Sequence, residues 1–284
     1  MGSLVSMPKP VNQTTALEVD GVRSFAGAGG GCASALHGQG HRAPPATWPA
    51  TWPVAVLGRL AAWLLPPRCL LCGLPGAGGL DLCPACRGGL PRLPPACPRC
   101  ALPAPEGRVC AACLARPPLQ AHTAAAFLYA SPVDRLLPRL KFHADLAAGR
   151  LLSRLALPAF AAAPRPQALL PLPLHRARLR RRGFDQALEL ARPLARALGL
   201  PLLTGGLRRQ RATAAQSELD ARERRRNVRG AFAVPPGVAL PAHLALFDDV
   251  MTTGATLGEA ARVLHAAGVR RVDLWALARA PPPG

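Results

Sequence analysis

Two adjacent carboxylates, Asp248 and Asp249, follow a short apolar run, Leu244–Phe247, and precede a small hydroxyl-rich turn, Thr252–Thr256. Apolar residues then recur at helical spacing over Leu257–Ala267. This order predicts a buried strand with an acidic end, a tight loop and a helix N-terminus. Ligands bind at the carboxyl ends of strands in open α/β sheets, and helix N-termini attract anions. The pattern therefore indicates an anion site beside two carboxylates; the alternative is an ordinary turn with a surface acid pair.

Eight cysteines form four Cys-x-x-Cys pairs within residues 69–113. The pairs are Cys69 and Cys72, Cys83 and Cys86, Cys97 and Cys100, and Cys110 and Cys113. Two such pairs supply the four thiolates of one closed zinc ribbon, so the segment predicts two structural Zn²⁺ ions. Because the intervening loops are short, we expect the first pair to join the second and the third to join the fourth; a cross-braced arrangement stays open. A disulfide framework is the competing interpretation, but no secretory signal is evident.

Positive charge dominates the chain, which has a formal net charge of +20. Arginines crowd into two stretches, Arg176–Gln186 and Arg208–Arg229. Such charge favours phosphorylated metabolites, nucleic acid or anionic lipid as partners. Aromatic residues make up only 4% of the chain, which argues against a base-stacking surface. No apolar run reaches the roughly 18 residues that a membrane span requires, so we expect a cytoplasmic protein without a membrane span.

Strands alternate with helices beyond residue 120. We expect strands over Ala124–Ala130, Ala168–Leu170, Leu200–Leu203, Ala231–Val234, Leu244–Phe247 and Val272–Leu277, and helices over Pro132–Phe142, Asp145–Leu155, Phe184–Leu198 and Leu257–Ala267. Pro193 predicts a kink or break in the third of these helices. The alternation implies an α/β fold with a mostly parallel sheet flanked by helices. The expected organisation is a disordered extension over residues 1–53, a double zinc ribbon with a leading helix, Val54–Leu65, over residues 54–118, and the α/β domain over residues 119–284.

The stretch Leu244–Thr256 resembles the phosphoribosyl diphosphate (PRPP) motif of type I phosphoribosyltransferases. In that family two acids hold the ribose 2- and 3-hydroxyls, and a Thr-Thr-Gly-x-Thr loop wraps the 5-phosphate. The resemblance implies the type I phosphoribosyltransferase fold, with Asp248 and Asp249 as the catalytic acids that hold the ribose. It implies a PRPP-binding loop made of Thr252, Thr253, Gly254, Ala255 and Thr256. It also implies Mg²⁺, bound with PRPP, and Arg or Lys donors that meet the charge growing on the leaving pyrophosphate.

An ordered set of further motifs is similar to the ComF (ComF/GntX-like) family. The motifs are Lys141 after a leucine-rich helix, Pro173-Leu174-His175, the string Arg182–Gln186, then Gln216, Arg222 and Asn227, and Gly230-Ala231-Phe232. Members of this family are bacterial phosphoribosyltransferase-like proteins linked to competence and DNA uptake, commonly with an N-terminal double zinc ribbon. This chain departs from the usual family pattern at Leu172, where valine is usual, and at Asp185, where asparagine is usual.

The resemblance also implies a pyrophosphate loop, Pro173–Arg176, and a loop over Arg178–Gln186 that closes over the site. The residues that it assigns to pyrophosphate and these loops are Lys141, His175, Arg176, Arg182 and Gly183. For His175 the functional interpretation is pyrophosphate binding or proton transfer, and the alternative, which is more usual for a lone histidine at a strand end, is a structural hydrogen bond.

Two functions fit these motifs. The first is an enzyme that transfers the phosphoribosyl group from PRPP to an acceptor, which the sequence does not identify. The second is a non-catalytic factor that senses PRPP, or binds single-stranded DNA or DNA-uptake proteins. Pyrophosphate release from PRPP favours the first function, and salt-sensitive DNA binding that is independent of Asp249 favours the second. The oligomeric state does not follow from the sequence.

Overall fold

The computed structural model describes residues 66–211 and 226–281, all of which belong to one compact unit, Pro53–Gly284. The predicted extension over residues 1–53 and the predicted helix Val54–Leu65 lie outside the described residues, as do Gln216 and Arg222. The division of the chain at residues 53 and 118 stays a prediction. Among the helices that the structure describes, none is both long and apolar enough to cross a membrane.

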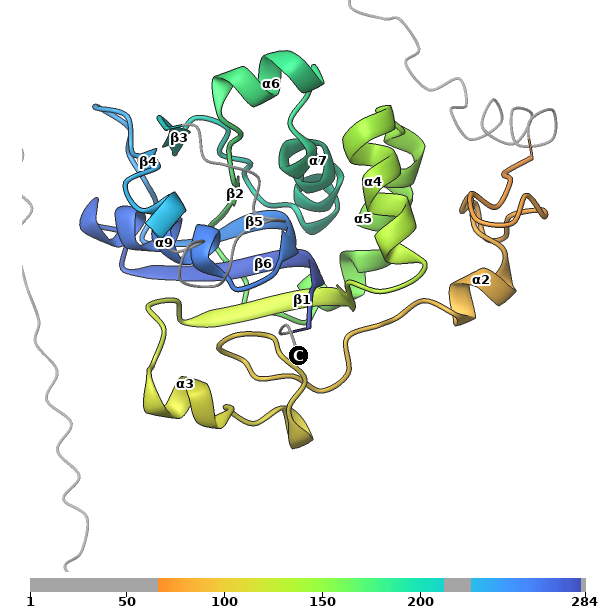
Figure 1. Ribbon diagram of the computed structural model, residues 1–284, viewed down its shortest axis with the longest axis horizontal. Coiled ribbons are helices and arrows are strands. Elements are labelled where there is room, and N and C mark those ends of the chain that lie inside the picture. The colour runs from red at the N-terminus through yellow and green to blue at the C-terminus, as the bar shows by residue number, and fades with distance from the viewer. Residues whose placement is uncertain (1–65, 212–225, 282–284) are drawn as a thin grey trace, which may run out of the picture. The chain divides into compact units, whose positions relative to one another are not determined.

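A four-stranded parallel sheet forms the centre of the α/β part (Figure 1). Its strands are β1 (His122–Leu128), β2 (Ala168–Pro171), β5 (His243–Met251) and β6 (Arg271–Arg279), in the order β1-β6-β5-β2. Each neighbouring pair is parallel. The two central strands, β5 and β6, are covered on both faces, and this explains their nearly continuous apolar sequences. The predicted parallel sheet is confirmed, and the carboxyl ends of its strands meet at one edge.

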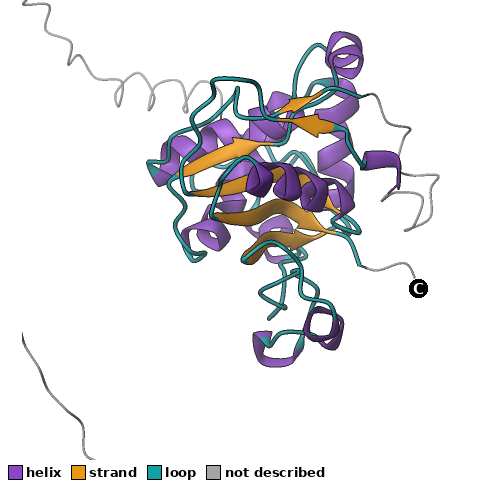
Figure 2. Ribbon diagram, turned by 90° about the vertical axis from the view of Figure 1, so that its left-hand side faces the viewer, coloured by secondary structure: helices purple, strands orange, loops and turns teal. Residues whose placement is uncertain are grey.

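Helices cover both faces of this sheet (Figures 1 and 2). The main helices are α4 (Val133–His143), α5 (Leu146–Ala161), α6 (Arg176–Arg182), α7 (Gln186–Leu198) and α9 (Ala255–Ala266). Shorter elements are α2 (Pro84–Gly88), η1 (Pro105–Gly107), α3 (Ala111–Ala115) and an antiparallel pair, β3 (Arg208–Arg209) with β4 (Phe232–Ala233). Side chains of β5 alternate between the two faces, since Ala245 and Phe247 pack with α4, α5 and α7, whereas Leu244 and Leu246 pack with α9.

An aromatic cluster fixes α5 against the two central strands. Phe160 of α5 stacks on Trp275 of β6 at 4.9 Å between ring centroids, and it meets the edge of Phe247 of β5 at 5.8 Å. All three rings are fully buried. Aromatic pairs of this kind add about 0.5–1.5 kcal/mol beyond their area burial. Because Phe247 directly precedes Asp248, the cluster anchors β5 just before its acidic end.

Three elements differ from their predicted form. The predicted strand Leu200–Leu203 contributes only an isolated parallel bridge beside β2. The strand β5 continues to Met251, so it contains the acid pair rather than ending before it. The helix α7 passes through Pro193 without a break. It buries an apolar face against α5, and this packing outweighs the hydrogen bond that the proline lacks.

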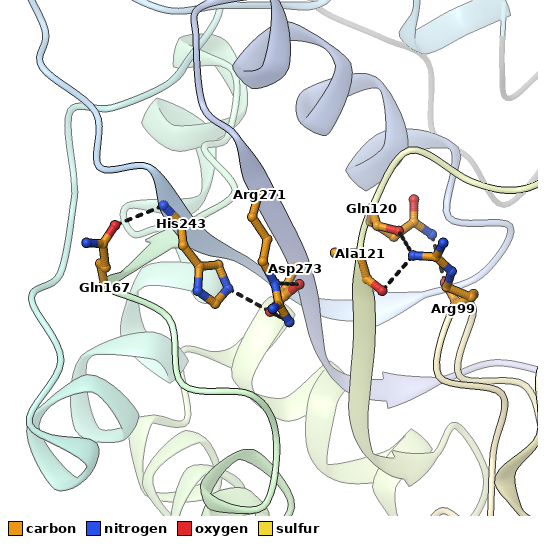
Figure 3. A network of polar contacts seen from close by, with 7 residues as sticks. All are labelled: Arg99, Gln120, Ala121, Gln167, His243, Arg271 and Asp273. Carbon is orange, nitrogen blue, oxygen red and sulfur yellow. Dashed lines mark hydrogen bonds and ion pairs between the residues drawn. The ribbon is translucent and has the colours of Figure 1, made fainter. Parts of the chain in front are cut away.

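A buried carboxylate, Asp273 of β6, organises the opposite edge of the sheet, where the strands begin (Figure 3). His243 Nε2 lies 2.8 Å from Asp273 Oδ2, and Arg271 donates to both carboxylate oxygens at 3.2 Å. The backbone N–H of His243 donates to Gln167 Oε1 at 2.9 Å. These contacts lie at the amino ends of the strands, so they tie the strands together at the edge away from the acid pair.

Candidate functional site

The acid pair lies at the carboxyl end of β5, the edge where ligands bind in parallel sheets. Asp249 is only 4% exposed, and its Oδ1 accepts a hydrogen bond from Val250 N at 2.9 Å. Asp248 Oδ1 accepts from Asp249 N at 2.8 Å. Both carboxylates line one cavity. Burial first, and then the charge of Asp249, raises the pKa of Asp248 well above its usual range, so the cavity disfavours two negative charges without a cation.

Lys141 of α4 supplies a cation at this point. Its ammonium group forms an ion pair with Asp249 Oδ2, and both side chains are largely buried. Burial lowers the pKa of Lys141, but the nearby carboxylates Asp249 and Asp248 raise it by more, so the net direction is upward. The lysine is therefore held in its charged form inside the cavity, where it can also meet the oxygens of an anionic ligand.

The threonine-rich turn, residues Thr252–Thr256, connects β5 to α9, and we refer to it as the phosphate loop. Gly254 has a φ of +73°, a left-handed conformation that glycine adopts without strain. It caps α9 without a side-chain hydrogen bond. The N-cap residue itself therefore occupies none of the free N–H groups at the positive end of the helix dipole. Thr252 and Thr256 line the cavity, while Thr253 Oγ1 accepts from Ala255 N at 3.3 Å.

The cavity has a volume of about 450 Å³, within the range of small-molecule sites. Besides the acid pair, Lys141, Thr252 and Thr256, its lining consists of Tyr129, Phe142, Leu172, Pro173, Leu174, Arg178, Arg181, Arg182, Gln186, Arg209 and Val250. Lysine and four arginines thus surround two carboxylates. This excess of positive charge favours a ligand with several negative charges.

The segment Arg178–Gln186 is largely helical, and the prediction of a loop is wrong for most of it. The helix α6 spans Arg176–Arg182 and ends at Gly183, whose φ is +84°. Arginine has a good helix propensity, and the His175 side chain caps the helix by accepting Ala177 N at 3.3 Å. The cavity is therefore bordered by a helix that presents arginines, rather than by an extended loop.

The structure brings only part of the predicted pyrophosphate set into the cavity. Lys141 and Arg182 line it, whereas His175, Arg176 and Gly183 are not among its lining residues. His175 instead has the structural role of a helix cap. The Arg182 guanidinium lies 5.7 Å from the centre of the Phe142 ring and donates to Gln186 Oε1. Its side chain is thus oriented by two neighbours before any ligand binds.

The polar lining residues Tyr129 and Arg209 were not singled out as site residues from the sequence. Tyr129 follows β1 at the carboxyl edge of the sheet. It is the single tyrosine of the chain, and this is the sequence feature that could have pointed to it. Arg209 is 7% exposed, and its guanidinium lies 5.4 Å from the centre of the Phe232 ring. Burial lowers the pKa of Arg209. Nothing in the sequence distinguishes it from the other arginines of its stretch.

Asp185, which stands where asparagine is usual in the family, accepts hydrogen bonds from three backbone N–H groups. Its Oδ1 accepts from Ala187 N at 3.0 Å and Leu188 N at 3.2 Å, which caps α7. Its Oδ2 accepts from Leu174 N at 2.9 Å. Asp185 does not line the cavity. The acid therefore positions the predicted pyrophosphate loop through Leu174 and makes no contact with the cavity itself.

We expect Asp185→Ala to lower the free energy of unfolding by about 1–2 kcal/mol, because α7 loses its cap and Leu174 loses its partner. Asp185→Asn should have a smaller effect, since its one carbonyl oxygen can keep the cap but cannot also serve Leu174. Urea unfolding of the two variants measures the difference. An alanine variant as stable as the wild type would show that these bonds contribute nothing.

The eight cysteines form two clusters, each with its four sulfur atoms within 4.8 Å of one another. The first cluster is Cys69, Cys72, Cys83 and Cys86, and the second cluster is Cys97, Cys100, Cys110 and Cys113. The pairing is therefore sequential, as predicted, and none of these cysteines forms a disulfide.

The geometry of both clusters fits tetrahedral zinc. The Sγ atoms of Cys72 and Cys83 are 3.6 Å apart, and those of Cys100 and Cys110 are 3.7 Å apart. Zn–S bonds of about 2.3 Å place sulfur atoms about 3.8 Å apart in a tetrahedron. Neighbouring cysteines, Cys83 before Cys72, raise the pKa of Cys86 to about 12, a penalty that a divalent cation removes. Four thiolates leave no open position, so each site is structural.

Comparison with known proteins agrees with this architecture. Residues 60–114 match the model of the double zinc ribbon domain. The chain is 35% identical over 179 residues to Competence protein F of Haemophilus influenzae, across 60% of this chain and 78% of that protein. It is 36% identical over 223 residues to DNA utilization protein YhgH of Escherichia coli O157:H7, across 76% of this chain and 98% of that protein. The DNA utilization protein YhgH of Salmonella typhimurium is 35% identical over 217 residues, across 74% of this chain and 89% of that protein.

The two DNA utilization proteins match over about three quarters of this chain, and all three matches cover most of each relative. Identity of this level over such lengths indicates common ancestry. On this ground the chain belongs to the ComF family.

Proposed function

We propose that the chain binds PRPP or a related ribose 5-phosphate ligand together with Mg²⁺, and transfers the phosphoribosyl group to an acceptor. One observation carries the proposal: Asp248 and Asp249, near the end of β5, share a basic cavity with Thr252, which follows β5, and Thr256, in the first turn of α9. Carboxylates beside a helix N-terminus suit a ligand that has hydroxyl groups and a phosphate within one small molecule.

Each part of the cavity has a role in this proposal. The acid pair accepts hydrogen bonds from the ribose hydroxyls, and Thr252 and Thr256 of the phosphate loop contact the 5-phosphate. Lys141 and Arg182, which approach from α4 and α6, meet the pyrophosphate. Before the ligand binds, Lys141 compensates the charge of Asp249, so binding replaces part of an existing ion pair rather than burying a new cation.

Transfer breaks the bond between ribose C1 and the pyrophosphate oxygen, and the acceptor forms a new bond to C1 and loses a proton. Mg²⁺ commonly binds through one or two carboxylates and substrate phosphates, so the donor set of Asp248 and Asp249 fits this ion. When bound, it offsets the charge of the leaving pyrophosphate. Lys141 and Arg182 hold the departing group by ion pairs, and the burial of the Lys141 side chain strengthens its pair.

Pyrophosphate release from PRPP tests the proposal. The zinc-loaded protein is incubated with PRPP, Mg²⁺ and a panel of bases and amines, and compared with Asp248→Asn and Asp249→Asn. We expect release in the wild type and a loss of at least about 100-fold in both variants, because each removes a charged group that acts on the ribose in the transition state. Equal release by the variants, or none by the wild type with any acceptor, would contradict transfer.

A non-catalytic role in DNA uptake is the second candidate, and the charge of α6 favours it. Its sequence, Arg-Ala-Arg-Leu-Arg-Arg-Arg, contains no acid, and much of it is exposed. The relatives named Competence protein F and DNA utilization protein YhgH support a link to competence and DNA uptake. In this role the fold senses PRPP or binds single-stranded DNA or a DNA-processing partner.

Fluorescence anisotropy with a labelled single-stranded oligonucleotide tests this second role. Arg176→Gln and Arg180→Gln alter α6 outside the cavity, and Asp248→Asn alters the cavity alone. If the role is correct, the two arginine variants bind the oligonucleotide more weakly and with a shallower salt dependence, while Asp248→Asn binds normally. Absence of salt-sensitive binding in the wild type would reject the role.

A further inference from the structure

Arg279, the last residue of β6, lies where the second cluster meets the phosphate loop. It is only 4% exposed. Its Nε donates to the carbonyl oxygen of Cys100 at 2.8 Å, so it contacts the backbone of a zinc ligand. Its Nη1 donates to Met251 O at 2.9 Å, to Thr252 O and to Ala280 O at 2.7 Å. One guanidinium therefore joins the second cluster to the point where the phosphate loop begins.

The chemistry of Arg279 makes this junction sensitive to the second cluster. Its four acceptors named above are backbone carbonyls, so their positions depend on how the two segments are held. A buried charged N–H that loses its acceptor destabilises the fold, so the guanidinium follows its acceptors when they move. Four thiolates and one Zn²⁺ sum to a charge of −2, which favours a cation beside the loaded cluster. Loss of the ion would remove the metal bond at Cys100, the residue whose carbonyl Arg279 contacts.

Beside the hydrogen bonds of Arg279, a cleft of about 1010 Å³ lies between the second cluster and the phosphate loop. One side is lined by Cys100, Cys110 and Cys113, and the other by Thr252–Ala255 at the start of α9; Arg279 lines it as well. The cleft leaves room for the second cluster and the phosphate loop to move relative to one another. The hydrogen bonds of Arg279 limit that movement at the loop's first residue.

We propose that Arg279 is a positioning residue that couples zinc in the second cluster to the conformation of the phosphate loop. The phosphate role of this loop rests on the proposed function, but the coupling concerns the loop itself. Zinc in the second cluster holds the Cys100 carbonyl, Arg279 transmits that position to Met251 and Thr252, and the loop is kept in its ligand-ready form. Because coupling is reciprocal, a ligand on the loop also strengthens the hold on that zinc.

Arg99 offers a matched control, because it lies between Cys97 and Cys100 of the second cluster (Figure 3). Its Nη1 donates to Gln120 O at 3.0 Å and Ala121 O at 2.7 Å, and its carbonyl accepts from Gln120 Nε2 at 2.9 Å. Arg99 thus fastens the second cluster to the start of β1. None of these partners belongs to the phosphate loop. Substitution of the Arg99 side chain removes its contacts with the start of β1 and leaves the four thiolates of the second cluster and the link through Arg279 in place.

Hydrogen–deuterium exchange of the full chain tests the coupling without a ligand. Cys113→Ser removes the last ligand of the second cluster, and Cys86→Ser removes that of the first. We expect the amides of residues 251–256 to exchange about tenfold faster or more in Cys113→Ser, and at the wild-type rate in Cys86→Ser. In Arg279→Met the loop amides should exchange fast with both zinc ions present, and adding Cys113→Ser should not increase their rates further.

Two further variants serve as controls. Arg279→Lys, which keeps the charge, should restore part of the protection, and in Arg99→Met the loop amides should exchange at the wild-type rate.

Three results would overturn the coupling. They are wild-type exchange rates of the loop amides in Cys113→Ser, wild-type rates in zinc-loaded Arg279→Met, or rates in Arg99→Met as fast as those in Arg279→Met. Calorimetric titration of the same wild-type protein with ribose 5-phosphate separates this question from the proposed function. Failure to bind rejects the phosphate role of the loop and leaves the exchange result to decide the coupling. Binding that Cys113→Ser and Arg279→Met weaken alike, and Arg99→Met does not, supports both.

Discussion

Asp248→Asn is expected to stabilise the protein while it abolishes ligand binding. In the folded chain burial and the charge of Asp249 raise the pKa of Asp248, so ionisation of Asp248 opposes folding. An amide of the same shape removes this effect, and we expect a gain of about 1 kcal/mol, or about 2–4 °C in Tm, at neutral pH. Thermal unfolding of the zinc-loaded protein measures the shift.

The pH dependence of this gain follows from the direction of the pKa shift. Below the ordinary value of 3.8, Asp248 is protonated in both folded and unfolded chains, so the variant gains nothing. As the pH rises toward the elevated folded pKa, the unfolded chain releases the proton and the folded chain keeps it, so wild-type stability falls. The gain of Asp248→Asn should therefore grow over this window and become constant above it.

Asp249→Asn is the matched control for Asp248→Asn, and we expect it to change the stability in the opposite direction. It removes the partner of Lys141 and leaves a largely buried ammonium with less compensation, so we expect a loss of about 2 kcal/mol. Both variants should lose ribose 5-phosphate binding. Equal shifts of Tm in the same direction for the two variants would contradict the electrostatic description of the acid pair.

Zinc content is expected to follow the sequential pairing of the cysteines. The wild type should hold two zinc ions per chain. A double substitution within one cluster, Cys69→Ser with Cys83→Ser, should leave one ion, whereas Cys69→Ser with Cys97→Ser should leave none. The second combination should also unfold at the lower temperature, because zinc supplies folding free energy to both ribbons. Elemental analysis after gel filtration gives the ion count.

A cross-braced arrangement reverses this outcome. Cys69 and Cys83 then belong to different sites, so their double substitution would leave no zinc. Retention of two ions in either double variant would contradict a four-thiolate site altogether.

Local sequence predicted the parts of the site whose residues are contiguous. The acid pair with its threonine-rich turn is one uninterrupted stretch, and the cysteine pairs have spacing that zinc itself requires. The roles of Arg209 and Asp185 could not be predicted in this way. Arg209 reaches the cavity only through the β3–β4 pair, and Asp185 acts on Leu174, eleven residues earlier, after the chain has turned.

Two predictions failed for separate physical reasons. The loop expected over Arg178–Gln186 is mostly α6, since the arginine run has good helix propensity and His175 caps it. Of the kink or break expected at Pro193, the break is absent because the buried face of α7 outweighs one missing hydrogen bond. In the first case local propensity outweighed the family resemblance, and in the second tertiary packing outweighed local propensity.

Calorimetric titration of the zinc-loaded protein with PRPP and Mg²⁺ tests the central claim most directly. The claim is that the acid pair and the phosphate loop bind a phosphorylated ribose. It predicts one binding site per chain in the wild type, and no binding in Asp248→Asn, whose raised Tm excludes unfolding as the cause. Absence of binding in the wild type, or undiminished binding in Asp248→Asn, would contradict it.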